Sequence, residues 1–222
     1  MNVRIGKEAS TMTGGFSMNK EQIFTIFGGT GDLTFRKLLP ALYNIEAADD
    51  KELSARIVVV GRRDYTSESY REAARGWVEK FARLRFQKET YEKFAGRIVY
   101  YRMDFTDENA YEELDSFYKK MQAGSHIFYF AVAPRFFSAI VKGLKRVEGA
   151  GEGKVVIEKP FGESLPAAAK LNESMEAFFK ADHIYRIDHY LGKEMVRNIQ
   201  INRFANPIFS QVWDAGHKEG HQ

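Results

Sequence analysis

The chain has 222 residues, of which 44 % are hydrophobic and 28 % charged, with no cysteine and a formal net charge of +3. This size and balance suit one large globular domain, or one domain with part of another, and exclude a disordered or fibrous chain. The missing cysteines exclude disulfide scaffolds and thiolate chemistry, and the weak positive charge argues against a dedicated nucleic-acid-binding protein.

The first 20 residues are polar and lack the apolar centre of a secretory signal. We interpret them as a flexible lead-in. No apolar run in the sequence approaches the ~18 residues that a membrane helix needs, so we expect no membrane partner. A cytoplasmic location is the simplest expectation for such a chain.

Short apolar segments rich in β-branched and aromatic residues then alternate with segments of helical periodicity. We predict strands at residues 23–27, 56–60, 98–101, 126–131, 154–158 and 184–187. We predict helices at residues 33–48, 67–86, 107–121, 136–147, 164–179 and 192–201. Pro40 is compatible with the first helix only in an opening turn. Because parallel neighbours need helical crossovers, the pattern predicts an α/β fold, a Rossmann-type doubly wound parallel sheet.

A glycine-rich loop joins the first predicted strand to the first helix. It reads Gly28-Gly29-Thr30-Gly31-Asp32-Leu33. Such a loop presents backbone N–H groups and the positive end of a helix to a pyrophosphate. Gly29 and Gly31 meet the dinucleotide-binding spacing, whereas Thr34 stands where a third glycine or alanine permits close helix packing. A tight turn without a ligand is the alternative.

Two arginines follow the second predicted strand, where NAD enzymes place an acidic residue for the ribose 2′-hydroxyl. The chain reads Gly61-Arg62-Arg63. A guanidinium suits a 2′-phosphate, so the position favours NADP over NAD, although plain surface arginines are the alternative.

Two later segments also follow predicted strands. In the first, Pro160 stops the strand, so that Lys159 is presented into the crevice at the sheet's edge. In the second, residues 186–193, His189 and Lys193 lie one turn apart if a helix begins near His189, and together form an anion site of phosphate size. A solvated Lys159, and a helix capped by Asp188 with a solvated Lys193, are the alternatives.

Four motifs together resemble the glucose-6-phosphate dehydrogenase family, and the resemblance runs from about residue 23 to residue 213. The motifs are GGTGDLTFRKLLPALY at residues 28–43, EKPFG at 158–162, RIDHYLGK at 186–193 and RFAN at 203–206. The EKP element also occurs in other NADP oxidoreductases, whereas the RIDHYLGK octet is very specific. The resemblance implies hydride transfer from C1 of glucose 6-phosphate to NADP⁺, and it suggests a homo-oligomer.

The resemblance also implies roles for individual residues. The loop residues Gly28, Gly29, Thr30, Gly31, Asp32 and Leu33 hold the cofactor, and Arg62 binds its 2′-phosphate. Lys159 contacts both substrate and nicotinamide, and Asp188 contributes at the catalytic centre. The sugar phosphate is held by His189, Tyr190 and Lys193.

The end of the sequence departs from the family pattern. The family's histidine base lies well downstream of the octet, on a second domain, and residues 214–222 resemble nothing in the family. We therefore divide the chain into a flexible segment at 1–20, an NADP-binding domain at 21–200, and the cut-off start of a second, α+β domain with an unpatterned tail at 201–222. His217 and His221 have a metal-binding spacing, but the neighbouring glycines argue against a stable helix, and no metal site is expected.

These departures lead to two functional expectations. The first is an incomplete dehydrogenase that binds NADP⁺, turns over glucose 6-phosphate poorly, and has low solubility because apolar surface is uncovered. The second is a non-catalytic NADP-binding or subunit-pairing module. A different sugar oxidoreductase of the EKP type is a third possibility, which the octet disfavours.

Overall fold

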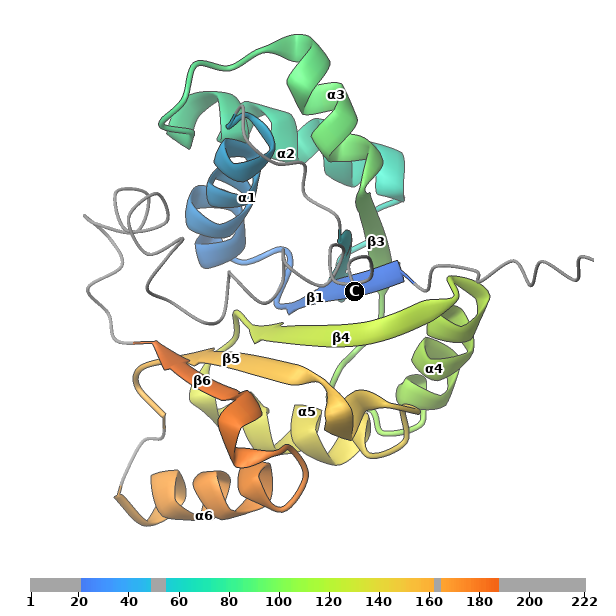
Figure 1. The fold of residues 1–222 in the computed structure, drawn as a ribbon, viewed down its shortest axis with the longest axis vertical. Coiled ribbons are helices and arrows are strands. Elements are labelled where there is room, and N and C mark those ends of the chain that lie inside the picture. Colours follow the sequence, from blue (N-terminus) through green and yellow to red (C-terminus); the bar gives the residue numbers. More distant parts are fainter. Residues whose placement is uncertain (1–20, 49–54, 162–164, 188–222) are drawn as a thin grey trace, which may run out of the picture.

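The structure, a computed structural model, describes residues 21–48, 55–161 and 165–187. Its centre is a single sheet of parallel strands in the order β3-β2-β1-β4-β5-β6 (Figure 1). The strands are β1 (Glu21–Phe27), β2 (Arg56–Gly61), β3 (Ile98–Arg102), β4 (Ala123–Phe130), β5 (Lys154–Glu158) and β6 (Ile184–Ile187). The order reverses between β1 and β4, which is the doubly wound topology, so the predicted fold class is confirmed.

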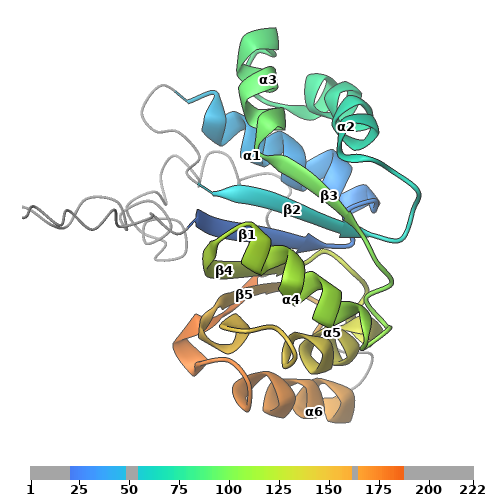
Figure 2. The same cartoon turned by 90° about the vertical axis from the view of Figure 1, so that its right-hand side faces the viewer.

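Helices cover both faces of this sheet (Figure 2). On one face lie η1 (Thr34–Leu38), α1 (Leu39–Glu46), α2 (Ser67–Phe81) and α3 (Lys88–Gly96). On the other lie α4 (Ala110–Lys120), α5 (Phe137–Leu144) and α6 (Leu165–Glu176). Short 3₁₀ turns occur at η2 (Pro134–Phe136), η3 (Ala150–Glu152) and η4 (Ala181–His183).

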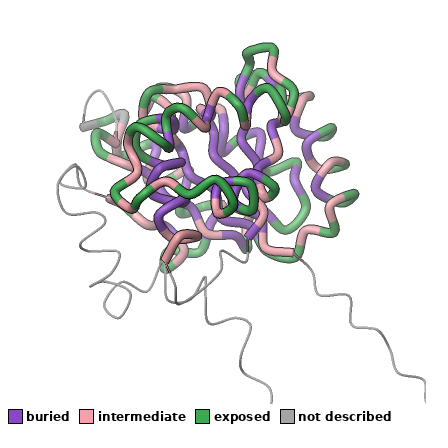
Figure 3. The backbone as a smooth tube through the Cα atoms, turned by 90° about the horizontal axis from the view of Figure 1, so that it is seen from above, coloured by how far each residue is buried: buried purple, intermediate pink, exposed green. Residues whose placement is uncertain are grey.

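The strands lack polar alternation because both of their faces are buried. In β2, Ile57 and Val59 pack toward α1, α2 and α3, whereas Val58 and Val60 pack toward α4, α5 and α6. All four side chains are completely buried. Figure 3 shows the resulting buried band along the middle of the fold, with exposed residues outside it. Burial on both faces is the physical origin of the apolar runs from which the strands were predicted.

The helix predicted at residues 67–86 is wrong at its C-terminal end. Helix α2 ends at Phe81, Ala82 is extended, and a separate helix, α3, follows. The side-chain oxygen of Asn44 accepts hydrogen bonds from the N–H groups of Arg83 and Leu84, at 3.1 and 3.0 Å. These bonds from a distant part of the chain replace the helical ones, which a local pattern does not reveal.

The first helix is also less regular than predicted. Helical backbone begins at residue 32, and a π-helical turn, η1, precedes α1. The N–H of Leu39 donates to the carbonyl of Thr34, five residues earlier. Pro40, which has no N–H to donate, lies in the first turn of α1, directly after this widened turn.

The helix predicted at residues 192–201 lies outside the described residues. In the part of the chain that is described, no helix has both the length and the apolar composition needed to cross a membrane.

Candidate functional site

The glycine loop lies at the carboxyl end of β1, between the ends of β2 and β4. Gly28 has φ +90°, and a Cβ on it would lie 2.3 Å from the carbonyl oxygen of Ala131. A Cβ on Gly29 would lie 1.9 Å from Cγ1 of Val59. Both positions therefore require glycine for the fold alone, whether or not a ligand binds.

Gly31 and Thr34 differ from these two glycines. A Cβ on Gly31 would lie 3.2 Å from the carbonyl oxygen of Gly28, and the open side of Gly31 faces a surface groove. Thr34 is completely buried, and its hydroxyl donates to the Gly28 carbonyl at 3.0 Å. Thr34 thus closes the loop with a hydrogen bond, and the π-helical turn begins at this residue. A buried threonine therefore occupies the position of the third glycine in the dinucleotide-binding spacing.

A groove of about 390 Å³ runs along this edge of the sheet. Its walls are the glycine loop and the residues that follow β2, β3 and β4. They are Gly28, Thr30, Gly31, Gly61, Arg62, Arg63, Asp104, Phe105, Thr106, Ala131, Val132, Ala133 and Phe136. The structure therefore brings Arg62 together with the loop, as the sequence predicted. Of the other loop residues, Asp32 is exposed and pairs with Arg36 at 3.5 Å, and Leu33 is half-buried.

Asp104 is a site residue that the sequence reasoning missed. Its carboxylate accepts hydrogen bonds from the hydroxyl and the N–H of Thr106, at 2.6 and 2.9 Å. These bonds, with a smaller contribution from Arg62, lower the pKa of Asp104 and keep it ionised. Its position shortly after the third predicted strand was the available signal, because carboxyl ends of parallel strands share one edge of the sheet.

Lys159 lies at the same edge, after β5. Its side chain is exposed, its N–H donates to the carbonyl of Ile187 at 3.1 Å, and the Lys159–Pro160 peptide bond is cis. The preceding residue, Glu158, accepts a hydrogen bond from the buried hydroxyl of Tyr129. The strand ends before the proline, as predicted, but Lys159 is not among the residues that line the groove.

The remaining predicted site residues, Asp188, His189, Tyr190 and Lys193, lie outside the described residues, as do His217 and His221. Strand β6 ends at Ile187, directly before this segment. Among the described residues, no group of three or more histidine, aspartate or glutamate side chains is placed to hold a metal ion.

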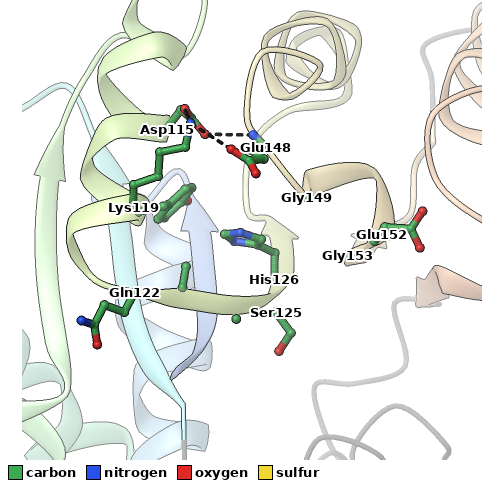
Figure 4. A pocket seen from close by; sticks show the side chains of 12 residues that line it. Asp115, Lys119, Gln122, Ser125, His126, Glu148, Gly149, Glu152 and Gly153 are labelled. Atoms are coloured by element: carbon green, nitrogen blue, oxygen red, sulfur yellow. Dashed lines mark hydrogen bonds and ion pairs between the residues drawn. The ribbon is translucent and has the colours of Figure 1, made fainter. Parts of the chain in front are cut away.

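A second groove, of about 580 Å³, lies at the opposite edge, beside the start of β4 (Figure 4). Two of its carboxylates share one lysine: the Lys119 ammonium lies 2.8 Å from Asp115 and 2.9 Å from Glu148. Asp115 also accepts from the N–H of Glu148 at 2.9 Å. Burial alone would raise the pKa of Asp115, but these bonds lower it overall. None of the site residues predicted from the sequence lines this groove.

Comparison with known proteins supplies independent findings. Residues 25–198 match the family model described as "Glucose-6-phosphate dehydrogenase, NAD binding domain". The glucose-6-phosphate 1-dehydrogenases of Bacillus subtilis and Leuconostoc mesenteroides are each 38 % identical over 200 residues, which is 86 % of this chain and 40 % of each relative.

Two solved structures are similar over most of the chain. The Mycobacterium avium glucose-6-phosphate 1-dehydrogenase has a TM-score of 0.68 at 32 % identity. A glucose-6-phosphate dehydrogenase in complex with its substrate glucose 6-phosphate has a TM-score of 0.67 at 29 % identity. Each likeness covers 86 % of this chain and 41 % of the other. The chain therefore spans about 40 % of the length of the relatives it matches.

Proposed function

The chain belongs to the glucose-6-phosphate dehydrogenase family, and we propose that it binds NADP⁺ at the carboxyl edge of its sheet for the oxidation of glucose 6-phosphate. The proposed reaction moves a hydride from C1 of glucose 6-phosphate to NADP⁺, giving 6-phosphogluconolactone and NADPH. Residues 25–198, which match the family's nicotinamide-dinucleotide-binding domain, support the division that assigns residues 21–200 to cofactor binding.

The observation that carries the cofactor assignment is the meeting of Gly31 and Arg62 in one groove. The helix that follows the loop starts at residue 32, and the N–H groups of a first helical turn have no acceptor inside the helix. They and the helix dipole suit a pyrophosphate, which the bare backbone of Gly31 allows to approach. The chain's own residues therefore fit a dinucleotide, with residues 28–33 as its cradle.

The choice of NADP over NAD rests on the end of β2. Arg62 and Arg63 are exposed there, at the position where an NAD enzyme has a carboxylate. A guanidinium binds a phosphate with two parallel hydrogen bonds. The ionised Asp104, which lines the same groove, suits an amino group such as that of adenine, because a carboxylate only accepts hydrogen bonds.

Lys159 is proposed to contact substrate and nicotinamide. Its position after β5, at the edge that also carries the groove, supports this role. NADP⁺, when bound, supplies the hydride acceptor. The proposed sugar-phosphate ligands are His189, Tyr190 and Lys193, with Asp188 at the catalytic centre; their support is the RIDHYLGK motif. A cytoplasmic location remains a prediction from the sequence, and a homo-oligomer remains a prediction from the family.

Titration calorimetry of the 222-residue chain tests the cofactor assignment. NADP⁺ should bind at least about tenfold more tightly than NAD⁺, because the 2′-phosphate adds charged hydrogen bonds. Equal affinities would contradict the assignment. Glucose 6-phosphate should then bind to the NADP⁺-saturated chain, whereas glucose, which lacks the phosphate, should not; equal binding of the two sugars would contradict the substrate assignment.

A further inference from the structure

A cluster of five aromatic side chains lies between the glycine loop and the end of β2. Tyr70 and Tyr100 stack with their ring centroids 5.0 Å apart, and Tyr65 packs edge-on against both, at 5.7 and 5.6 Å. Phe35 continues the stack from Tyr70 to Trp77, at 5.3 and 5.8 Å. The cluster thus joins η1, α2 and β3, three elements whose loops surround the groove.

Two hydroxyl groups of this cluster bind backbone carbonyls, one in the glycine loop and one in the segment that follows β2. The Tyr70 hydroxyl donates to the carbonyl of Gly29 at 2.5 Å. The Tyr100 hydroxyl donates to the carbonyl of Arg63 at 2.8 Å. Burial raises the pKa of both phenols, so both stay neutral and keep the proton that they donate. One tyrosine therefore holds the glycine loop, and the other holds the arginine segment.

Gly61 makes room for the second of these bonds. A Cβ on Gly61 would lie 2.7 Å from the Tyr100 hydroxyl oxygen and 3.1 Å from Cγ2 of Thr30. The missing side chain therefore lets Tyr100 reach the Arg63 carbonyl, and it lets the glycine loop approach the end of β2. A side chain at position 61 would therefore disturb both Tyr100 and the glycine loop.

We propose that Tyr70 and Tyr100 are positioning residues with separate tasks in cofactor binding. Tyr70 fixes the loop that holds the pyrophosphate, which NAD⁺ and NADP⁺ share. Tyr100 fixes the segment of Arg62 and Arg63, which faces the 2′-phosphate that NADP⁺ alone carries. Neither hydroxyl touches the cofactor in this scheme; each acts through a backbone carbonyl. The inference rests on the proposed binding of NADP⁺.

A general stabilising role is the competing explanation, and the chain provides a matched control for it. Tyr91 is buried in the same apolar core, and its hydroxyl donates to the carbonyl of Arg71 at 2.5 Å. This bond has the same chemistry as the other two, but it joins α3 to α2 and reaches neither the glycine loop nor the segment of Arg62 and Arg63. If tyrosine–carbonyl bonds only stabilise the fold, Tyr91→Phe should behave like Tyr70→Phe and Tyr100→Phe.

The experiment compares these three variants in the 222-residue chain, with NADP⁺ and NAD⁺ as probes in titration calorimetry and with thermal unfolding measured alongside. Tyr100→Phe should weaken NADP⁺ binding about fivefold and NAD⁺ binding less than about twofold. Tyr70→Phe should weaken both by about the same factor. Tyr91→Phe should lower the melting temperature by a similar amount and leave both affinities unchanged.

Gly61→Ala is a second route to the same result if Tyr100→Phe does not fold. Its added methyl group displaces the Tyr100 hydroxyl without removing it, so the preference for NADP⁺ should again fall. A preference that survives in the folded variant, or that falls equally in all three phenylalanine variants, would overturn this inference alone. A wild-type chain that binds NADP⁺ and NAD⁺ equally would overturn the proposed function as well.

Discussion

The two edges of the sheet carry grooves of different size and different charge. The groove at the amino edge, where the strands begin, has a volume of about 580 Å³. The groove at the carboxyl edge, where the strands end, is smaller, about 390 Å³. At the amino edge, Lys119 is held between Asp115 and Glu148. At the carboxyl edge, the exposed Arg62 faces a groove whose floor is bare glycine backbone. The proposed cofactor site is therefore the smaller groove, and it is distinguished by an exposed guanidinium beside open glycine backbone.

A glycine with positive φ occurs at each edge, but only at one of them would a side chain also clash with its neighbours. A Cβ on Gly28 would clash with Ala131, whereas a Cβ on Gly149 would meet nothing within 4 Å. At the amino edge the glycine serves a turn. At the carboxyl edge it lets the loop pass between neighbouring strands, where parallel sheets hold their ligands.

The largest effect on stability is expected from the substitution of Gly28 by alanine, with Gly149 as the comparison. Gly28→Ala should destabilise the protein by about 3 kcal/mol or more, since it adds a steric clash to the cost of positive φ. Gly149→Ala, with φ +73°, should cost only about 1 kcal/mol. Urea unfolding of both variants checks this. Equal losses would show that the close approach at Gly28 is not what requires glycine there.

Removal of the cation at the carboxyl edge should weaken binding of NADP⁺. Arg62→Gln should weaken NADP⁺ binding by about 2 kcal/mol, which is about thirtyfold, and leave NAD⁺ binding unchanged. The loss comes from charged hydrogen bonds to the 2′-phosphate. Calorimetry with both nucleotides measures it, and a loss of affinity for NAD⁺ of the same size would contradict the assignment of Arg62.

We expect His126, at the amino edge, to make the stability of the fold depend on pH. Its side chain is 6 % exposed, and burial lowers its pKa. The unfolded state therefore binds more protons below about pH 6.5, so acidification through that range should destabilise the fold. His126→Phe, which keeps the stack on Phe128, should flatten this dependence. Urea midpoints at about pH 7.5 and about pH 5.5 test this; an unchanged slope in the variant would assign the dependence to other groups.

The smallest effect is expected for Lys119→Gln. The bonds to Asp115 and Glu148 raise the pKa of Lys119, yet its side chain is 57 % exposed. Because water screens such pairs, the melting temperature should hardly change, and affinity for NADP⁺ should not change. A weakened affinity would mean that the amino-edge groove is coupled to the cofactor site.

The predictions that depend on neighbouring residues were correct, whereas one that depends on contacts between distant residues was wrong. Strands β5 and β6 begin and end at the predicted residues, because burial on both faces leaves an apolar run in the sequence itself. The end of α2 was mispredicted, because the N–H groups of Arg83 and Leu84 donate to the side chain of Asn44, about 40 positions away in the chain. The sequence at the end of the predicted helix, residues 82–86, continues a helical pattern and carries no local sign that the helix ends at Phe81.

The candidate site shows the same division. By itself, the sequence determined the alternation of strands and helices, the glycine loop and the arginines after β2, because each depends on residues that are neighbours in the chain. Tertiary structure alone decided that Asp104 and Arg62 line one groove, that Tyr70 and Tyr100 bind the carbonyls of Gly29 and Arg63, and that Gly61 leaves room for Tyr100 and Thr30. These arrangements follow from the order and register of the strands, which bring distant residues to one edge of the sheet.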